Sequence, residues 1–281
     1  MSPISRRRLI AGTAAIGLLG GCGSPQRQPG IATPQQLHAD ISVWDAVTLP
    51  SAHVSSSVTV TYGHGIEGLP EFPGDAVRPE DLGGGLFLQI CGDDPDAVRD
   101  AASRLRPDGR LRWREKGSCN SGRTNVLGFK DGIVVPKTPR EFAQEVWRPD
   151  GSTFAVVRRM KLDVAAFTAM PVADQERVFG RRKHDAVPLS GGDEVDLSAK
   201  TPDGEYVIPA DAHVRRAHPL TAGAGLMLRR SYNYDEGLIF ISYQRELKTF
   251  VNTMHRMADG DALLRYATTT SSAAFRIPTL N

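Results

Sequence analysis

A strand followed by a helix occurs once in each half of this chain, and this repeat restricts the possible folds more than any other feature. In the first half, residues 85–91 form an apolar run typical of a buried strand, and apolar side chains then recur at helical spacing over residues 97–105. In the second half, residues 237–243 repeat the strand character, and helical spacing follows over residues 250–257. A chain of 281 residues can form one large domain or two small ones. The repeat favours two small α+β domains.

Other segments fit the same alternation of strands and helices. Strand patterns cover residues 57–62 and 153–160, and a helix is expected over residues 164–179. The turn-rich segment Trp-Arg-Pro-Asp-Gly-Ser, residues 147–152, separates the two halves. The expected domains are therefore residues 31–147 and residues 148–281.

The first residues read as an export signal. The sequence Ser-Arg-Arg-Arg-Leu-Ile at residues 5–10 resembles the twin-arginine export motif. The apolar run over residues 9–21 is too short for a bilayer, which needs about 20 residues. A disordered basic terminus is the alternative. Because twin-arginine export carries folded proteins, it suits a protein that takes up a cofactor inside the cell and then works in the cell envelope or outside it.

The end of this signal contains a cysteine. Residues 19–22, Leu-Gly-Gly-Cys, resemble a lipobox, in which Cys22 would be lipidated and would tether the mature chain to a membrane. Cleavage before a residue that carries no lipid is the alternative. We therefore expect residues 1–22 to be a signal peptide with a lipobox and residues 23–30, rich in Pro, Gln and Gly, to be a tether.

Charge and cysteine content exclude some partners and chemistries. Removal of residues 1–21 takes away three arginines, so 34 basic residues become 31 against 32 acidic ones. No basic stripe remains, and nucleic acid is not an expected partner. Cys91 lies in an apolar strand pattern and is expected to be a buried thiol, although a disulfide with Cys119 stays open. No Cys-x-x-Cys motif occurs, which argues against a redox dithiol.

Three separate segments carry an acid, a histidine and an arginine. Asp131 lies in Gly-Phe-Lys-Asp-Gly, His213 in Asp-Ala-His-Val-Arg-Arg, and Arg229 in Leu-Arg-Arg. An iron-haem peroxidase needs such groups as an axial ligand, a base that moves a proton on peroxide, and a cation that stabilises the breaking O–O bond. Each residue has an alternative: the Lys-Asp-Gly segment can be a plain hairpin turn, and Arg230 competes with Arg229. Spacing alone does not choose between His213 and His218.

These motifs resemble those of one family. Gly-Phe-Lys-Asp-Gly matches the Gly-x-x-Asp-Gly signature of the dye-decolourising (DyP-type) peroxidases, and residues 212–215, Ala-His-Val-Arg, resemble their proximal-histidine motif. The resemblance extends from residue 30 almost to the C-terminus. It implies two ferredoxin-like α+β domains packed together in the manner of a dimeric α+β barrel, with haem b in the C-terminal half. It also implies hydrogen peroxide and a one-electron donor as substrates, with a homo-oligomer left open.

The resemblance assigns a role to each candidate residue. His213 becomes the axial ligand, Asp131 the base and Arg229 the cation, because the family's axial histidine precedes a branched apolar residue and an arginine. Asp261 is the candidate acid behind His213, with a helix N-cap as the alternative. The residues expected to contact haem are Gly132, Ile133, Val134, Arg181, Arg215, His218, Pro219 and Arg229.

The chain departs from the family pattern at four places. Relatives commonly have Asn-Pro-Arg where this chain has His218-Pro219-Leu220, and Leu220 cannot bind a haem propionate as an arginine does. They usually have Gly-Thr-Ala-Asn-Pro where residues 132–136 read Gly-Ile-Val-Val-Pro. The family's Leu-Arg-Arg-Gly-Tyr segment is Leu-Arg-Arg-Ser-Tyr here, at residues 228–232. Relatives also usually carry a longer helical insertion between residues 44 and 58, so a trimmed first domain is expected.

Three functions are compatible with these motifs. The first is a haem peroxidase that oxidises dye-like or phenolic donors, with a surface aromatic residue as electron relay. The second is release of iron from haem, since exported members of the family occur beside iron-uptake proteins. The third is a haem carrier without turnover, which the retention of Asp131 and Arg229 disfavours because storage needs neither. The candidate relay residues are Trp113, Trp147, Tyr232 and Tyr234.

Overall fold

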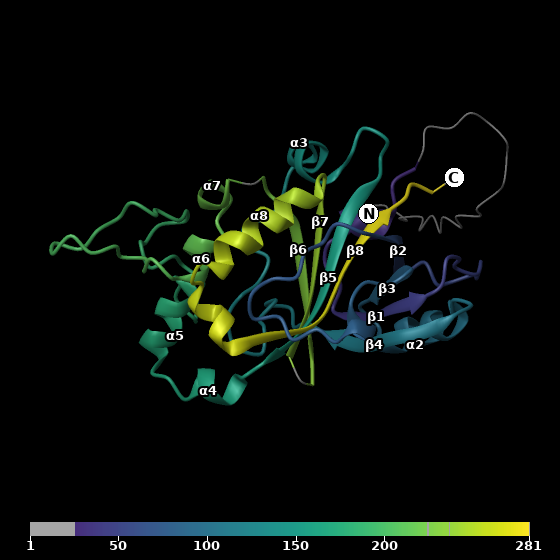
Figure 1. Cartoon of the computed structure of the whole chain (residues 1–281), viewed down its shortest axis with the longest axis horizontal. Coiled ribbons are helices and arrows are strands. Elements are labelled where there is room, and N and C mark those ends of the chain that lie inside the picture. Colours follow the sequence, from purple (N-terminus) through teal and green to yellow (C-terminus); the bar gives the residue numbers. More distant parts are fainter. Residues whose placement is uncertain (1–25, 224, 236, 281) are drawn as a thin grey trace, which may run out of the picture.

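Eight antiparallel strands close into one barrel in the computed structural model of the chain, which describes residues 26–223, 225–235 and 237–280 (Figure 1). Around the barrel the strands follow the order β1-β3-β2-β8-β5-β7-β6-β4. Their bounds are β1 (His38–Asp45), β2 (Val58–Ile66), β3 (Leu86–Gly92), β4 (Arg110–Ser118), β5 (Thr153–Leu162), β6 (Leu228–Tyr234), β7 (Gly237–Gln244) and β8 (Ala267–Ile277).

The two halves of the chain build the same sheet. The first half gives the order β4-β1-β3-β2 and the second gives β8-β5-β7-β6, so each places its fourth, first, third and second strands side by side. This is the ferredoxin-like arrangement, and the predicted α+β fold with two ferredoxin-like units is confirmed. The two sheets join where β2 pairs with β8 and where β4 pairs with β6 at Ser118 and Asn233. Neither half therefore has a free sheet edge.

Large apolar side chains fill the barrel. Alternate residues of each strand point inward, and the largest fully buried side chains here are Tyr232, Tyr243, Phe87 and Phe275. Cys91 belongs to this interior, where burial raises the pKa of its thiol, and neither it nor Cys119 forms a disulfide. The expectation of a buried thiol is confirmed.

Helices cover the outer faces of the barrel. The longest are α8 (Leu247–Ala258), α2 (Pro95–Arg104) and α5 (Val172–Phe179). The others are α1 (Pro29–Ala32), η1 (Pro79–Asp81), α3 (Pro139–Glu141), η2 (Phe142–Val146), α4 (Val164–Thr168), α6 (His213–Arg216), α7 (Pro219–Ala222) and η3 (Ala262–Tyr266). The described residues include no helix that is long and apolar enough to cross a membrane.

One predicted helix was wrong in its extent. The single helix expected over residues 164–179 is two helices, α4 and α5, separated at Pro171. Proline has no N–H to donate and restricts the residue before it to extended backbone, so a helix cannot run through this point without a kink. The chain turns there, and α5 then ends at Gly180, which has a left-handed φ of +83°.

The connection between the first two strands differs sharply between the halves. In the first half, residues 46–57 link β1 to β2 without a helix, and Leu49 and Val54 pack onto the sheet in its place. In the second half, residues 163–227 link β5 to β6 and contain four helices. Part of this second connection, residues 182–212, projects as a green arm beside α6 in Figure 1.

Candidate active site

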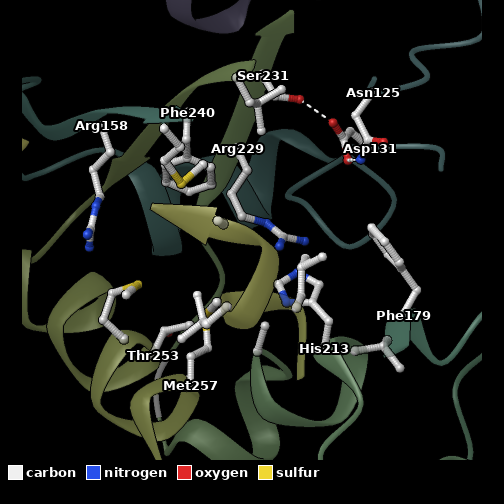
Figure 2. A pocket seen from close by; sticks show the side chains of 18 of the residues that line it. Asn125, Asp131, Arg158, Phe179, His213, Arg229, Ser231, Phe240, Thr253 and Met257 are labelled. Atoms are coloured by element: carbon white, nitrogen blue, oxygen red, sulfur yellow. Dashed lines mark hydrogen bonds between the residues drawn. The ribbon is translucent and has the colours of Figure 1, made fainter. Parts of the chain in front are cut away.

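A deep cavity lies between the C-terminal sheet and the helices packed on it. Strands β5, β6 and β7 form one wall, α6 and α8 form the opposite wall, and the loop over residues 125–134 closes one side (Figure 2). The cavity opens to solvent at its mouth, and about 1660 Å³ of space free of protein atoms, open solvent included, lies within and in front of its walls. Asp131, Arg229, His213 and His218 all line it.

His213 is held by a buried acid. Its Nδ1 lies 2.7 Å from Oδ2 of Asp261, whose side chain is 0% exposed. An ionised carboxylate can only accept, so Nδ1 carries the proton and Nε2 is left with a free lone pair. Asp261 also accepts from the backbone N–H of Leu263 through Oδ1, at 2.9 Å, and so caps η3. The two roles considered for Asp261 therefore coexist, one on each oxygen.

His218 has no such partner among the described residues. Its Nδ1 accepts from the backbone N–H of Leu220 at 3.3 Å, at the start of α7. Burial, together with the charges of Arg181 and Arg229, lowers the pKa of His218, which favours a neutral ring. Both histidines line the cavity, but only His213 has the carboxylate that orients a metal-binding imidazole. The structure thus distinguishes two residues that spacing could not.

The Asp131 carboxylate accepts hydrogen bonds from two side chains. Its Oδ1 accepts from Nδ2 of Asn125 at 3.0 Å, and its Oδ2 accepts from the hydroxyl of Ser231 on β6. Burial raises the pKa of Asp131, and these two hydrogen bonds and the charges of Arg229 and His213 oppose that rise. The Asp131 carboxylate therefore does not cap its own backbone, as it would in a plain hairpin turn, but accepts from two side chains and faces the cavity.

The turn that carries Asp131 is built around Asn125. Oδ1 of Asn125 accepts from the backbone N–H groups of Leu127 and Phe129 at 3.0 and 3.1 Å, which leaves its Nδ2 directed at Asp131. Gly132 follows with a left-handed φ of +69°, and an added Cβ there would meet only the Arg229 carbonyl, at 4.0 Å. Glycine at this position thus serves the turn conformation.

Arg229 and Arg230 point in opposite directions because they are neighbours on one strand. Arg229 faces the cavity, where Nη2 donates to the carbonyl of Val134 at 2.9 Å and burial lowers the pKa of the guanidinium. Arg230 donates to the carbonyls of Gly30 and Ile31, each at 2.7 Å, and so fastens the N-terminal segment. Arg229 is therefore the cation of the cavity.

An aromatic cluster ties the Asp131 turn to the His213 helix. Phe129, two residues before Asp131, stacks on Phe179 with ring centroids 3.8 Å apart and an angle of 4° between the planes. Phe179 then meets the His213 ring edge-on at 6.0 Å. Stacked and edge-on aromatic pairs of this kind are stabilising beyond the area that they bury. The loop that carries Asp131 and the helix that carries His213 are thus held together by aromatic packing.

The remaining predicted contact residues divide into two groups. Ile133, Val134, Arg181 and Pro219 line the cavity, as does Gly132, and their contacts to a cofactor stay predictions. Arg215 lies outside the lining: its Nε and Nη2 donate to the carbonyls of Ile208 and Pro209. The contact of Arg215 with a cofactor stays a prediction, which this arrangement does not support because its donors stabilise the loop before α6.

Haem was expected in the C-terminal half, but the cavity takes lining residues from both halves of the chain. Asp131 comes from the first half, and residues 73–75 of the β2–β3 connection close the far end. There Arg158 of β5 pairs with Asp75 and donates to Thr269 Oγ1 at 2.6 Å. At the other end Leu220, which stands where relatives commonly have arginine, is 85% exposed. Both halves of the chain therefore build the site.

Most of the candidate relay residues lie inside the protein. Trp113, Trp147 and Tyr232 are each less than 5% exposed, and Tyr234 is partly buried. Tyr206, which was not among these candidates, lies in the projecting arm over residues 182–212. It is 47% exposed, and the Arg215 guanidinium lies 4.4 Å from its ring centroid.

Comparison with known proteins agrees with this geometry. The family described as Dyp-type peroxidase, C-terminal, matches residues 122–281. The chain is 32% identical over 250 residues to a dye-decolorizing peroxidase of Thermobifida fusca, covering 75% of this chain and 58% of that protein. It is 30% identical over 239 residues to a deferrochelatase of Escherichia coli, covering 72% and 56%. The chain thus spans a little over half the length of the curated relatives it matches.

Solved structures give the same result for the fold. A DyP-type peroxidase of Streptomyces coelicolor superposes with a TM-score of 0.78 at 26% identity, covering 90% of this chain and 92% of that one. The ferric DtpA protein of Streptomyces lividans gives a TM-score of 0.77 at 26% identity, covering 92% of each chain. Together with the match over residues 122–281, these likenesses establish that the chain belongs to the DyP-type peroxidase family.

Proposed function

We propose that this chain is a haem b peroxidase that reduces hydrogen peroxide and oxidises one-electron donors. The observation that carries the proposal is the hydrogen bond of 2.7 Å between His213 and the buried Asp261, on the wall opposite Asp131 and Arg229. An imidazole fixed in this way can ligate iron, and Asp131 and Arg229 are available to act on a peroxide that enters the same cavity.

The charges of the cavity fit haem. Two acids line the cavity, Asp131 and, at the far end, Asp75, which pairs with Arg158. Burial and the charge of Arg229 lower the pKa of both Arg181 and His218, so these three basic groups lie close together. Such a cluster favours a ligand that carries anionic groups, and haem carries two propionates. The apolar walls from Leu238, Phe240 and Met257 suit the porphyrin ring. His213 would hold the iron, and Arg181 and His218 are the groups available to a propionate.

The protein groups divide the proton and charge work between them. Haem iron, when bound, supplies the redox chemistry of peroxide reduction. Asp131, ionised and facing the cavity, accepts a proton from the inner oxygen of peroxide and returns it to the outer oxygen. Arg229 stays charged and stabilises the negative charge on the departing oxygen. Asp261 keeps the His213 ring in one tautomer and increases its basicity as a ligand.

Haem titration of matched histidine variants tests the proposal. The parental protein and His218→Ala are expected to give a Soret band, and His213→Ala is expected to give little absorbance or a spectrum that added imidazole restores. Rapid mixing with hydrogen peroxide then tests turnover with a phenolic donor. A parental spectrum in His213→Ala together with loss in His218→Ala would overturn the ligand assignment. Slow bleaching without donor oxidation would favour the haem carrier.

Release of iron from haem is the second candidate function. Several relatives that are 30–31% identical to this chain are named deferrochelatases, and the exposed Leu220 removes one arginine that could hold a propionate. The two functions leave different products. Iron release yields metal-free porphyrin, which fluoresces, whereas peroxidase turnover yields oxidised donor and no porphyrin fluorescence. Iron-uptake proteins would be partners only if the protein releases iron from haem.

We also propose that the protein is exported by the twin-arginine pathway and anchored by lipid at Cys22. These residues lie outside the described part of the chain, and the support is the motif alone. Replacing Arg6 and Arg7 with lysine is expected to retain the precursor in the cytoplasm, as fractionation would reveal. Cys22→Ser is expected to abolish lipidation. Normal processing and equal membrane association of Cys22→Ser would contradict the anchor.

A further inference from the structure

Two departures from the family pattern meet at one carboxylate. The family pattern described above has glycine at the position of Ser231 and usually threonine at the position of Ile133. In the structure, Ser231 donates a hydrogen bond to Asp131, and Ile133 lines the same cavity as Asp131. Relative to that pattern, one change adds a hydroxyl beside the acid, and the other removes a hydroxyl from its cavity.

The position of Ser231 follows from the strand that carries it. Side chains alternate along β6, so Ser231 faces the same side as Arg229 and opposite to Arg230 and Tyr232. Figure 2 shows Ser231 and Arg229 on one wall, with the dashed bond running from Ser231 to Asp131. A glycine at this position could offer no donor to the carboxylate. The second partner, Asn125, belongs to the turn of Asp131 itself.

We propose that Ser231 is a positioning residue that holds the Asp131 carboxylate ionised and in one orientation, in compensation for the apolar residue Ile133 that lines the same cavity. This inference rests on the proposed function, in which Asp131 acts as a base. A base must be ionised to accept a proton, and an apolar cavity favours the neutral acid. A hydroxyl that donates to the charged form reverses part of that preference.

The groups that face Asp131 are few. Arg229 from β6 and His213 from α6 favour the charged carboxylate, as do the hydrogen bonds from Ser231 and Asn125, whereas burial raises its pKa. The Cys119 thiol is also close enough to interact with it electrostatically, but burial raises the pKa of that thiol and keeps it neutral. Ser231 and Asn125 are the two uncharged donors of this group, and Ser231 can be replaced without losing the bonds by which Asn125 holds its own turn.

The ionisation of Asp131 can be measured in the haem-free protein. Aspartate labelled with ¹³C at the carboxyl group reports its own titration, and the Asp131 signal is identified by its loss in Asp131→Asn. A hydrogen bond to a charged group is stronger than one between neutral groups, so its loss favours the neutral acid. Ser231→Ala is therefore expected to weaken acid dissociation of Asp131 about tenfold, a rise of about one pKa unit. Ser231→Thr, which keeps the hydroxyl, is expected to stay near the parental value.

A neighbouring serine provides the matched control. Ser242 on β7 pairs directly with Arg229, and its buried hydroxyl has no hydrogen-bond partner within the described residues. Ser242→Ala should leave the Asp131 titration unchanged. An unchanged titration in Ser231→Ala, or an equal shift in Ser242→Ala, would overturn the inference. In an Ile133→Thr background the effect of Ser231→Ala should shrink, and an undiminished effect would remove the compensation.

A kinetic measurement separates this inference from the proposed function. With haem bound, the acid limb of the pH profile for peroxide reduction should move upward in Ser231→Ala by the same amount as the titration. If the titration shifts but the kinetic limb does not, Ser231 still holds Asp131 as inferred, and the role of Asp131 as the base is what fails.

Discussion

The two halves of this barrel have the same sheet and very different connections between their first two strands. In the first half, residues 46–57 cross from β1 to β2 without a helix, and in the second half residues 163–227 make the corresponding crossing with four helices. His213 and Arg181 lie in the longer crossing. A sheet of fixed order can therefore serve as a scaffold in both halves, and the length of one connection decides which half carries the candidate iron ligand.

The first half nevertheless contributes to the site. Asp131 and Asn125 come from the segment after β4, and residues 73–75 close the far end of the cavity. Because β2 pairs with β8 and β4 pairs with β6, these contributions depend on the closed barrel. The comparison shows that the second half supplies most of the cavity walls, while the first half completes them and protects the sheet edges.

The largest effect is expected from separating the halves. A fragment of residues 148–281 lacks β2 and β4, which pair with the outer edges of β8 and β6. The two sheet edges left unpaired would promote aggregation. We expect this fragment to lose cooperative thermal unfolding and to take up no haem, as calorimetry and absorption would show. A fragment that unfolds cooperatively and gives a Soret band would mean that the barrel need not be closed.

The next largest effect, on the rate of peroxide reduction, is expected from Asp131 of the first half and Arg229 of the second half, which both line the cavity. Asp131→Asn removes the base and is expected to cost ~10²–10⁴ in the rate of peroxide reduction, and Arg229→Leu is expected to cost ~10²–10³. The double variant should lose less than the product of the two, because both groups act on one transition state. Near-parental rates in both single variants, measured in single turnovers, would remove the assignment.

Packing should also differ between the two connections. Phe179 is 8% exposed and stacks on Phe129, so Phe179→Ala is expected to lower the free energy of unfolding by about 3–5 kcal/mol. Leu49 covers the sheet from the helix-free connection and is only partly buried, and Leu49→Ala is expected to cost about 1 kcal/mol. Denaturant unfolding measures both. Equal losses would show that the short connection packs as tightly as the long one.

A smaller effect concerns pH and stability. Because the pKa of Asp131 is raised in the folded protein, folding is favoured while the group is protonated and opposed once it ionises. Asp131→Asn is therefore expected to stabilise the protein at neutral pH, by about 1.4 kcal/mol for each unit of raised pKa. The gain should vanish below the pKa of an unfolded aspartate. A loss of stability at neutral pH would contradict the raised pKa.

The smallest change in stability is expected at Leu220, which is 85% exposed. Leu220→Arg should alter the free energy of unfolding by no more than about 0.5 kcal/mol. It restores the arginine that relatives carry, so transfer of haem to a globin acceptor should slow. Leu220→Gln is the control for polarity without charge. Equal transfer rates in the two variants would show that this position does not bind a propionate.

The sequence by itself determined the elements with strong local patterns. The buried strands β3 and β7 and the helices α2 and α8 lie where apolar periodicity placed them. The motif residues Asp131, His213 and Arg229 do line one cavity. Such features are local, because apolar side chains that recur every two residues in a strand or every 3.6 residues in a helix can be recognised within a short stretch of sequence. The helix break at Pro171 was also readable, since proline marks it in the sequence.

Only the tertiary structure decided which strands meet and which way equivalent side chains point. The closure of the barrel rests on pairings between β2 and β8 and between β4 and β6, whose residues are more than a hundred positions apart. The carboxylate that distinguishes His213 from His218 is that of Asp261, which lies 48 residues away from His213. The proposed role of Ser231 rests on its bond to Asp131, one hundred positions earlier. Contacts of this range depend on how the whole chain is folded, and no local pattern encodes them.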